Sequence, residues 1–322
     1  MKRYTFYFIL SAIGVGALAG KSQAHSGDIV YPAWELPTSA LPDLHDGSLA
    51  DWEDWVPGPS FSLNDMGPAG PFEDGARGFD PDELFVDIYV GWNSTTQRLY
   101  IGAAFTDDHL SAAAGALRDS VWLFDGIEVM IDGDHSGGIY AYPPEQTPII
   151  PRHSGPLFSH GESGLTAAEE RDFNYGQAQH YFASPQTGTG PSVGLGFEPA
   201  ASWITRPPYA DIGGSIQGGS PNRAVIEFMI TPFDHFNRMD PTVSRPSRLA
   251  AHGIIGIQFG VPDFDDQPGH LRDYFSLSGQ AQIRRDASVF VDFQLYPCQQ
   301  CTATVSQPTS WSWIKARFLG IP

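Results

Sequence analysis

Two acidic loops hold residues whose types and spacing suit the binding of a metal ion. Residues 132–138 read DGDHSGG and residues 263–269 read DFDDQPG, so carboxylates alternate with turn-forming residues in both. Carboxylate oxygens in such loops are the hard ligands that calcium prefers, while Asp and Gly together also form plain turns. We therefore predict calcium as the cofactor of these loops, with the metal ligands Asp132, Asp134, Asp263, Asp265 and Asp266.

A third group of chemically useful residues lies just before the first acidic loop, where residues 122–131 read WLFDGIEVMI. Side chains alternate along a strand, so Ile127, Val129 and Ile131 are expected on one face, with Glu128 and Met130 on the other. A carboxylate on a concave sheet face beside a Trp suits the hydroxyls and the ring of a sugar. The predicted ligand-binding residues are Trp122, Asp125 and Glu128.

This segment and the residues before it resemble the family 9 carbohydrate-binding modules and the related DOMON-like sandwiches. The family opens with a segment like 46–52 (DGSLADW) and follows with a hairpin like 90–101, which ends at Thr106-Asp107-Asp108. It then has a Trp, an Asp three residues later and a Glu three residues after that, as at Trp122, Asp125 and Glu128. The resemblance covers about residues 43–134.

The resemblance implies a β-sandwich that binds a polysaccharide or another glycan. Trp122 would stack on a terminal sugar, Glu128 would accept hydrogen bonds from its hydroxyls, and structural calcium is common in the family. The family's second clamp Trp lies in the loop before the last strand, whereas residues 278–288 contain no aromatic residue. Another aromatic side chain would have to replace it, and the candidates are Tyr181, Trp203, Tyr274 and Phe275.

Short strands must position these residues. The chain has 35 Gly and 27 Pro among 322 residues, and its central part shows no sustained apolar period of 3.6, so long helices are disfavoured. Runs of β-forming residues predict a hairpin at 84–92 and 98–105 and further strands at 126–131, 179–183, 223–230, 253–260 and 288–296. Strands without intervening helices predict an all-β fold, an antiparallel β-sandwich with jelly-roll or immunoglobulin-like layers.

The remaining parts of this single domain, residues 25–297, are predicted to be irregular. Segments 133–178 and 185–221 are rich in Gly, Pro and Ser and are expected to be long loops. Residues 25–79 are expected to wrap around a few short strands. Trp52 and Trp92 are expected in the core, because Trp in a sandwich is more often buried than exposed to a ligand.

The two ends of the chain are predicted to lie outside this domain. Residues 1–24 combine two basic residues, an apolar run and small residues, which is typical of a cleaved secretory signal, so we expect a secreted, periplasmic or cell-surface protein. In the tail 298–322, Cys298 and Cys301 form either a local disulfide or a free pair. A short helix at 310–320 presents Trp311 and Phe318 on one face, which docks on the sandwich or on a cell-surface partner.

The charge of the chain excludes one class of partner. Its 37 acidic and 18 basic residues give a net charge of -19, which repels nucleic acid. Because no nucleophile elbow, zinc-protease motif or phosphate loop is present, we predict a non-catalytic protein. Two alternatives remain for the same fold: a cell-surface interaction or structural protein without sugar binding, and a haem-binding electron-transfer subunit with a Met such as Met130 as an axial ligand.

Overall fold

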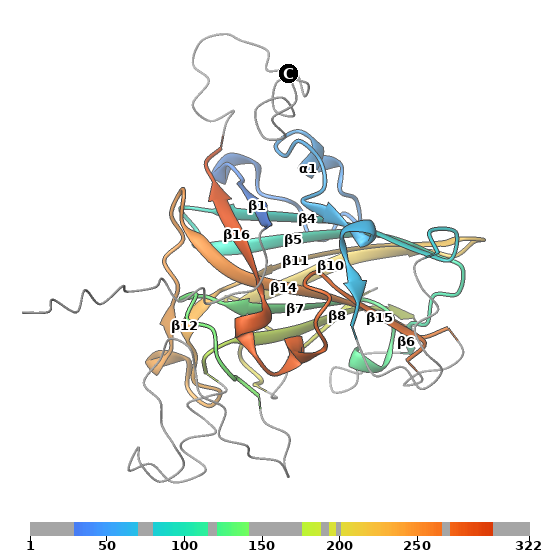
Figure 1. Cartoon of the computed structure of the whole chain (residues 1–322). Helices are drawn as coiled ribbons and strands as arrows, with labels where there is room; N and C mark the ends of the chain where they lie inside the picture. The colour runs from blue at the N-terminus through green and yellow to red at the C-terminus, as the bar shows by residue number, and fades with distance from the viewer. Residues whose placement is uncertain are drawn as a thin grey trace, which may run out of the picture.

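The computed structural model describes residues 29–69, 80–114, 121–141, 176–187, 193–197, 201–265 and 271–298. Its main strands form two packed layers, which Figure 1 shows one above the other. The first layer has the order β10-β11-β5-β4, with the bounds Ala210–Gln217, Asn222–Ile230, Arg98–Asp107 and Leu84–Asn93. The second has the order β16-β14-β7-β8-β9, with the bounds Val291–Tyr296, Ile254–Asp263, Ile127–Asp132, Gln179–Thr187 and Val193–Phe197. The predicted β-sandwich is confirmed.

One strand joins the two layers. β1 (Val30–Glu35) pairs in parallel with both β4 and β16, whereas the pairs within the two layers are antiparallel. The described residues include one short α-helix, α1 (Ala50–Glu53). The other short strands are β2 (Phe61–Ser62), β3 (Gly67–Pro68), β6 (Ala113–Ala114), β12 (Phe233–His235), β13 (Arg245–Pro246) and β15 (Asp273–Ser276). The single-turn 3-10 helices are η1 (Thr38–Ala40), η2 (Leu63–Asp65), η3 (Val121–Leu123), η4 (Pro241–Val243), η5 (Ala281–Arg284) and η6 (Ala287–Val289).

The core lies between the layers and is built by alternation along each strand. On β7, Ile127, Val129 and Ile131 face this core as predicted, because all three belong to its buried cluster. Phe61 beside β4 and Phe259 on β14 meet across it with ring centroids 4.8 Å apart. Each large apolar side chain buried here contributes about 1.5–3 kcal/mol to folding.

The prediction that 185–221 is entirely loop is wrong, because this segment contains β9 and β10. Their sequences, VGLGF and ADIGGSIQ, are rich in Gly and therefore lack the usual strand signal. At Gly213 the reason is a close approach of the backbone rather than a turn, since an added Cβ would overlap the carbonyl oxygen of Leu44. Of the other predicted loop, 133–178, the structure describes residues 133–141 and 176–178.

The N-terminal wrap, residues 36–56, covers the outer face of β4, β5 and β11. Its anchor is Trp52, which is fully buried and donates its indole N–H to Oε1 of Glu227 at 2.8 Å. A Cβ at Gly91 would come within 3.2 Å of the Trp52 ring, and one at Gly102 within 3.1 Å. The absence of a side chain at these two strand positions therefore leaves room for the indole. Trp52 and Trp92 are core residues, as predicted.

The predictions for the two ends of the chain stay predictions. Residues 1–28 and 299–322, with the expected signal and the helix carrying Trp311 and Phe318, lie outside the described residues. Cys298 is disulfide-bonded, and Cys301 lies outside the described part. Among the described helices, none has the length and apolar character needed to cross a membrane.

Candidate functional site

Trp122 is exposed on the second layer of the sandwich. It lies in η3, directly before β7, and its side chain is 39% exposed; among the described residues it is the single aromatic of the exposed large hydrophobic side chains. Its ring centroid is 6.0 Å from that of Phe182 on β8, and Phe182 in turn lies 4.3 Å from the His180 ring. An exposed indole therefore ends a row of rings that runs along the outer face of β8.

Glu128 lies on the same outer face but below the surface. It is 1% exposed, and Phe182 is its cross-strand neighbour on β8. Its carboxylate binds His180 Nε2 at 3.0 Å, the Tyr274 hydroxyl at 2.9 Å, and the Nε and Nη2 groups of Arg284. The expected concave face with an accessible carboxylate is therefore a covered face, and the Glu128 oxygens are already hydrogen-bonded.

The covering comes from loops that the strand pattern does not reveal. Tyr140 and the segment 283–290 form a buried cluster with Tyr274 over the outer side of β7. Met130, the candidate haem ligand, is fully buried in this cluster. Tyr274 reaches Glu128 because Gly260 on β14 has no side chain, and a Cβ there would overlap the tyrosine hydroxyl.

Arg284 is the charged partner that decides the ionisation of Glu128. Burial alone raises the pKa of Glu128, but the Arg284 guanidinium and the His180 hydrogen bond outweigh it and lower this pKa to about 2. Desolvation lowers the pKa of Arg284, but the Glu128 carboxylate outweighs it and raises this pKa above its ordinary value. The guanidinium also lies 4.5 Å from the Tyr274 ring centroid, while 42% of the Arg284 side chain stays exposed. Glu128 thus fixes a cationic side chain that is partly exposed to solvent.

Asp125 is a connecting residue in this structure. It is 1% exposed, its Oδ1 accepts from the backbone N–H of Phe264 at 2.7 Å, and its Oδ2 accepts from that of Ser111 at 2.5 Å. Burial, with the nearby Asp107 charge, raises the pKa of Asp125 to about 8. Both oxygens are buried and bound to the backbone. The predicted ligand-binding role of Asp125 stays a prediction.

The first acidic loop forms a hydrogen-bonded turn. Asp132 accepts from the backbone N–H groups of Ser136 at 3.2 Å and Gly137 at 2.6 Å. Asp134 lies 3.7 Å from Arg245, and burial together with the neighbouring Asp132 charge raises the pKa of Asp134 to about 6. These contacts satisfy Asp132 with the protein's own donors.

The second acidic loop joins a larger group of carboxylates, which we name the acidic cluster. It consists of Glu83, Asp107, Asp108, Asp263 and Asp265, and oxygens of Glu83, Asp108 and Asp265 lie within 4.8 Å of one another. Asp266 lies outside the described residues. The cluster combines the chain before β4, the end of β5 and the end of β14, so most of its members are far apart in the sequence.

The acidic cluster contains buried oxygens without a partner. Both carboxylate oxygens of Asp263, Oδ2 of Asp107 and Oδ1 of Asp265 are buried and accept no hydrogen bond from the residues that the structure describes. Arg272 binds Glu83 at 2.6 Å and also contacts Asp265. Burial, and then the Glu83 charge, raises the pKa of Asp263 to about 8, and burial raises that of Asp107 to about 6. One guanidinium does not balance five carboxylates, and the unpartnered oxygens fit a bound cation.

Among the described residues, none of the proposed substitutes for the second clamp Trp packs its ring against Trp122. Tyr181 and Phe275 are in the core between the layers, and Tyr274 is buried against Glu128. Trp203 packs on Tyr209, with ring centroids 4.7 Å apart. The aromatic neighbour of Trp122 is instead Phe182, which the sequence pattern did not single out.

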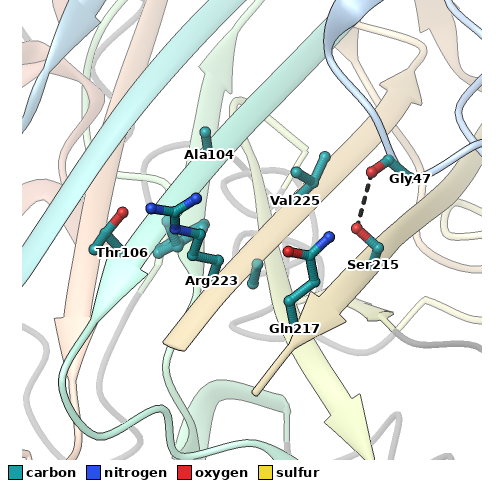
Figure 2. A pocket seen from close by; sticks show the side chains of 9 residues that line it. Gly47, Ala104, Thr106, Ser215, Gln217, Arg223 and Val225 are labelled. Atoms are coloured by element: carbon teal, nitrogen blue, oxygen red, sulfur yellow. Dashed lines mark hydrogen bonds between the residues drawn. The ribbon is translucent and has the colours of Figure 1, made fainter. Parts of the chain in front are cut away.

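An open groove of about 250 Å³ lies on the first layer, away from Trp122. Figure 2 shows Thr106, Arg223 and Gln217 on its floor, from the neighbouring strands β5, β11 and β10. Gly47 of the N-terminal wrap closes one side, where the Ser215 hydroxyl donates to the Gly47 carbonyl oxygen at 2.8 Å. This groove has no exposed aromatic residue in its lining, but its exposed Arg223 is a matched control for Arg284.

Comparisons with known proteins give structural likenesses. No family model matches the chain, and no curated protein matches it. A family 9 carbohydrate-binding module from Caldicellulosiruptor kristjanssonii, solved with cellotriose, is similar with a TM-score of 0.46 and 11% identity, covering 87% of this chain and 99% of the module. A family 9 module from the same organism, solved with glucose, gives a TM-score of 0.45 at 11% identity over the same shares of the two chains.

Proposed function

We propose that this protein is a non-catalytic glycan-binding protein that acts outside the cell after removal of residues 1–24. The observation that carries the proposal is the pair of exposed groups on the outer face of β7 and β8. The Trp122 ring packs on Phe182, Phe182 is the cross-strand neighbour of Glu128, and Glu128 holds Arg284 at the surface. An aromatic face and a fixed hydrogen-bond donor are therefore connected through the cross-strand pair of Phe182 and Glu128.

The two exposed groups are complementary to a sugar in different ways. The Trp122 ring offers an apolar surface on which the C–H face of a sugar ring stacks. Arg284 offers N–H groups to hydroxyl or carbonyl oxygens, and because Glu128 already orients it, little side-chain entropy is lost on binding. In this proposal Glu128 acts through Arg284, and direct contact with sugar hydroxyls would require Arg284 to move aside.

Titration of the full chain with sugars tests the proposed site. A panel that includes glucose and cellotriose is suitable, with affinity measured by calorimetry. We expect Trp122→Ala and Arg284→Ala each to weaken binding at least tenfold, whereas Arg223→Ala in the groove of Figure 2 leaves it unchanged. Equal weakening by all three variants would show that the site assignment is wrong, since Arg223 lies on the other layer.

We also propose that calcium binds in the acidic cluster. The support is the set of unpartnered buried oxygens on Asp107, Asp263 and Asp265, since burying such groups is costly without a partner. Calcium takes six to eight oxygen ligands at about 2.3–2.6 Å, which suits mixed mono- and bidentate carboxylates. Asp263 and Asp265 were predicted ligands, and Glu83, Asp107 and Asp108 complete the set. We place the ion here rather than at Asp132, whose oxygens accept from the backbone.

Unfolding with and without calcium tests this second site. A ligand that binds only the folded chain stabilises it by about 2.7 kcal/mol at a hundred times its Kd. We therefore expect a clear rise in Tm in millimolar calcium relative to EGTA. Asp263→Asn should remove most of that rise, whereas Asp211→Asn, a half-exposed carboxylate on β10, should keep it. An unchanged Tm in the unmodified protein would refute the calcium site.

A further inference from the structure

Asp125 connects the segment that carries Trp122 with two loops of the acidic cluster. Its Oδ1 accepts from the N–H of Phe264, which lies inside the loop 263–265, at 2.7 Å. Its Oδ2 accepts from the N–H of Ser111, and its own N–H donates to the Ser111 carbonyl oxygen at 3.0 Å. Ser111 closely follows the end of β5. A shift of either loop is therefore passed to Asp125, three residues from Trp122.

The two loops that meet at Asp125 carry buried carboxylates that repel each other when both are ionised, as they are when they bind a cation. Asp107 and Asp263 are each 1% exposed and carry buried oxygens that no donor in the described part of the chain contacts. Like charges buried near one another repel strongly, because the surrounding dielectric constant is low. A cation between the end of β5 and the loop 263–265 removes this repulsion and favours the arrangement in which Asp125 binds both loops.

We propose that calcium in the acidic cluster increases the glycan affinity of the Trp122 surface, and that Asp125 is the positioning residue that couples the two sites. The inference rests on the proposed function. With both backbone hydrogen bonds in place, η3 is fixed and Trp122 lies against Phe182. Without the cation, the loop 263–265 and the segment at Ser111 move apart, and the Trp122 ring samples positions in which it no longer completes the sugar-binding face.

The emission of Trp122 tests the coupling without any sugar. The difference between the spectra of the unmodified chain and Trp122→Phe isolates this residue from the other tryptophans. We expect calcium to shift this difference spectrum relative to EGTA in the unmodified chain. The shift should be absent in Asp125→Ala and partly restored in Asp125→Asn, which keeps one acceptor oxygen. Asp211→Ala is the control and should respond like the unmodified chain.

Sugar titrations give the size of the coupling. We expect the Kd for the best sugar of the panel to be at least fivefold higher in EGTA than in calcium, and sugar to tighten calcium binding by the same factor, because coupling between sites is reciprocal. In Asp125→Ala, calcium should still bind but should no longer change the Kd for sugar. If circular dichroism shows that this variant does not fold, Asp125→Asn and the unmodified chain supply the comparison.

The outcomes separate the coupling from the two sites. If calcium and sugar both bind but neither the Trp122 emission nor the sugar affinity responds to calcium, the coupling is overturned and the proposed function stays intact. A chain that binds no calcium overturns both the cation site and the coupling. A chain that binds calcium and no sugar refutes the glycan site, and an unchanged Trp122 emission in that case overturns the coupling as well.

Discussion

Replacing Glu128 by Gln measures how strongly the folded chain stabilises this carboxylate. Its pKa is about 2 instead of 4.5, which at 1.36 kcal/mol for each pKa step corresponds to about 3 kcal/mol in a residue that is 1% exposed. Because the pKa is lowered on folding, this stabilisation is complete above pH 4.5 and is lost as the pH falls towards 2. Gln has nearly the same volume but no charge to contribute.

Denaturant unfolding of both proteins at pH 7 and pH 3 gives the required difference. We expect the free energy of unfolding of Glu128→Gln to be lower than that of the unmodified chain at pH 7, and the gap to shrink by about 2 kcal/mol at pH 3. The other titrating groups are present in both chains and cancel in the comparison. Glu53→Gln, at an exposed position of α1, is the control for the loss of a carboxylate elsewhere in the chain. A gap of the same size at both pH values would refute the proposed pairing with Arg284.

Three further substitutions, of which Gly218→Ala is a control, test the N-terminal wrap and the strands beneath it. Gly213→Ala should lower the free energy of unfolding by about 2 kcal/mol, because its Cβ would overlap the Leu44 carbonyl oxygen. In Gly218→Ala the added Cβ meets no described residue within 4 Å, so the free energy of unfolding should change by less than about 0.5 kcal/mol. Burial raises the pKa of Glu227 to about 8, although the hydrogen bond from Trp52 lowers it. Because the pKa is higher in the folded chain, the stability of the fold falls progressively as the pH rises from about 4.5 to 8. Glu227→Gln should therefore gain stability relative to the unmodified chain over that range, and a difference that does not change with pH would contradict the assignment.

Much of the sandwich could be predicted because local alternation determines it. The hairpin 84–92 and 98–105 corresponds to β4 and β5, and five further predicted strands correspond to β7, β8, β11, β14 and β16. β9 and β10 were missed because their Gly residues weaken the strand signal, and at Gly213 of β10 the Gly is required by Leu44, which is distant in sequence. Gly is required at position 213 by a tertiary contact, and the local sequence pattern carries no information about that contact.

The candidate site was accessible from the sequence only in part. The spacing from Trp122 to Glu128 pointed to the correct strand and to its alternation, but not to the loops that cover its outer face. His180, Tyr274 and Arg284 reach Glu128 from three separate segments, and their convergence depends on the pairing of β7, β14 and β15. For the same reason the acidic loop 263–265 could be identified from sequence, whereas its completion by Glu83 could not.

The central claim is that sugar binds at the surface formed by Trp122 and Arg284. The most direct measurement is a calorimetric titration of the full chain with the sugar panel, in calcium, for the unmodified protein, Trp122→Ala and Arg223→Ala. We expect saturable binding by the unmodified chain, at least tenfold weaker binding by Trp122→Ala, and unchanged binding by Arg223→Ala. Sugar affinity that is the same in Trp122→Ala as in the unmodified chain, or no binding to any sugar of the panel, would contradict it.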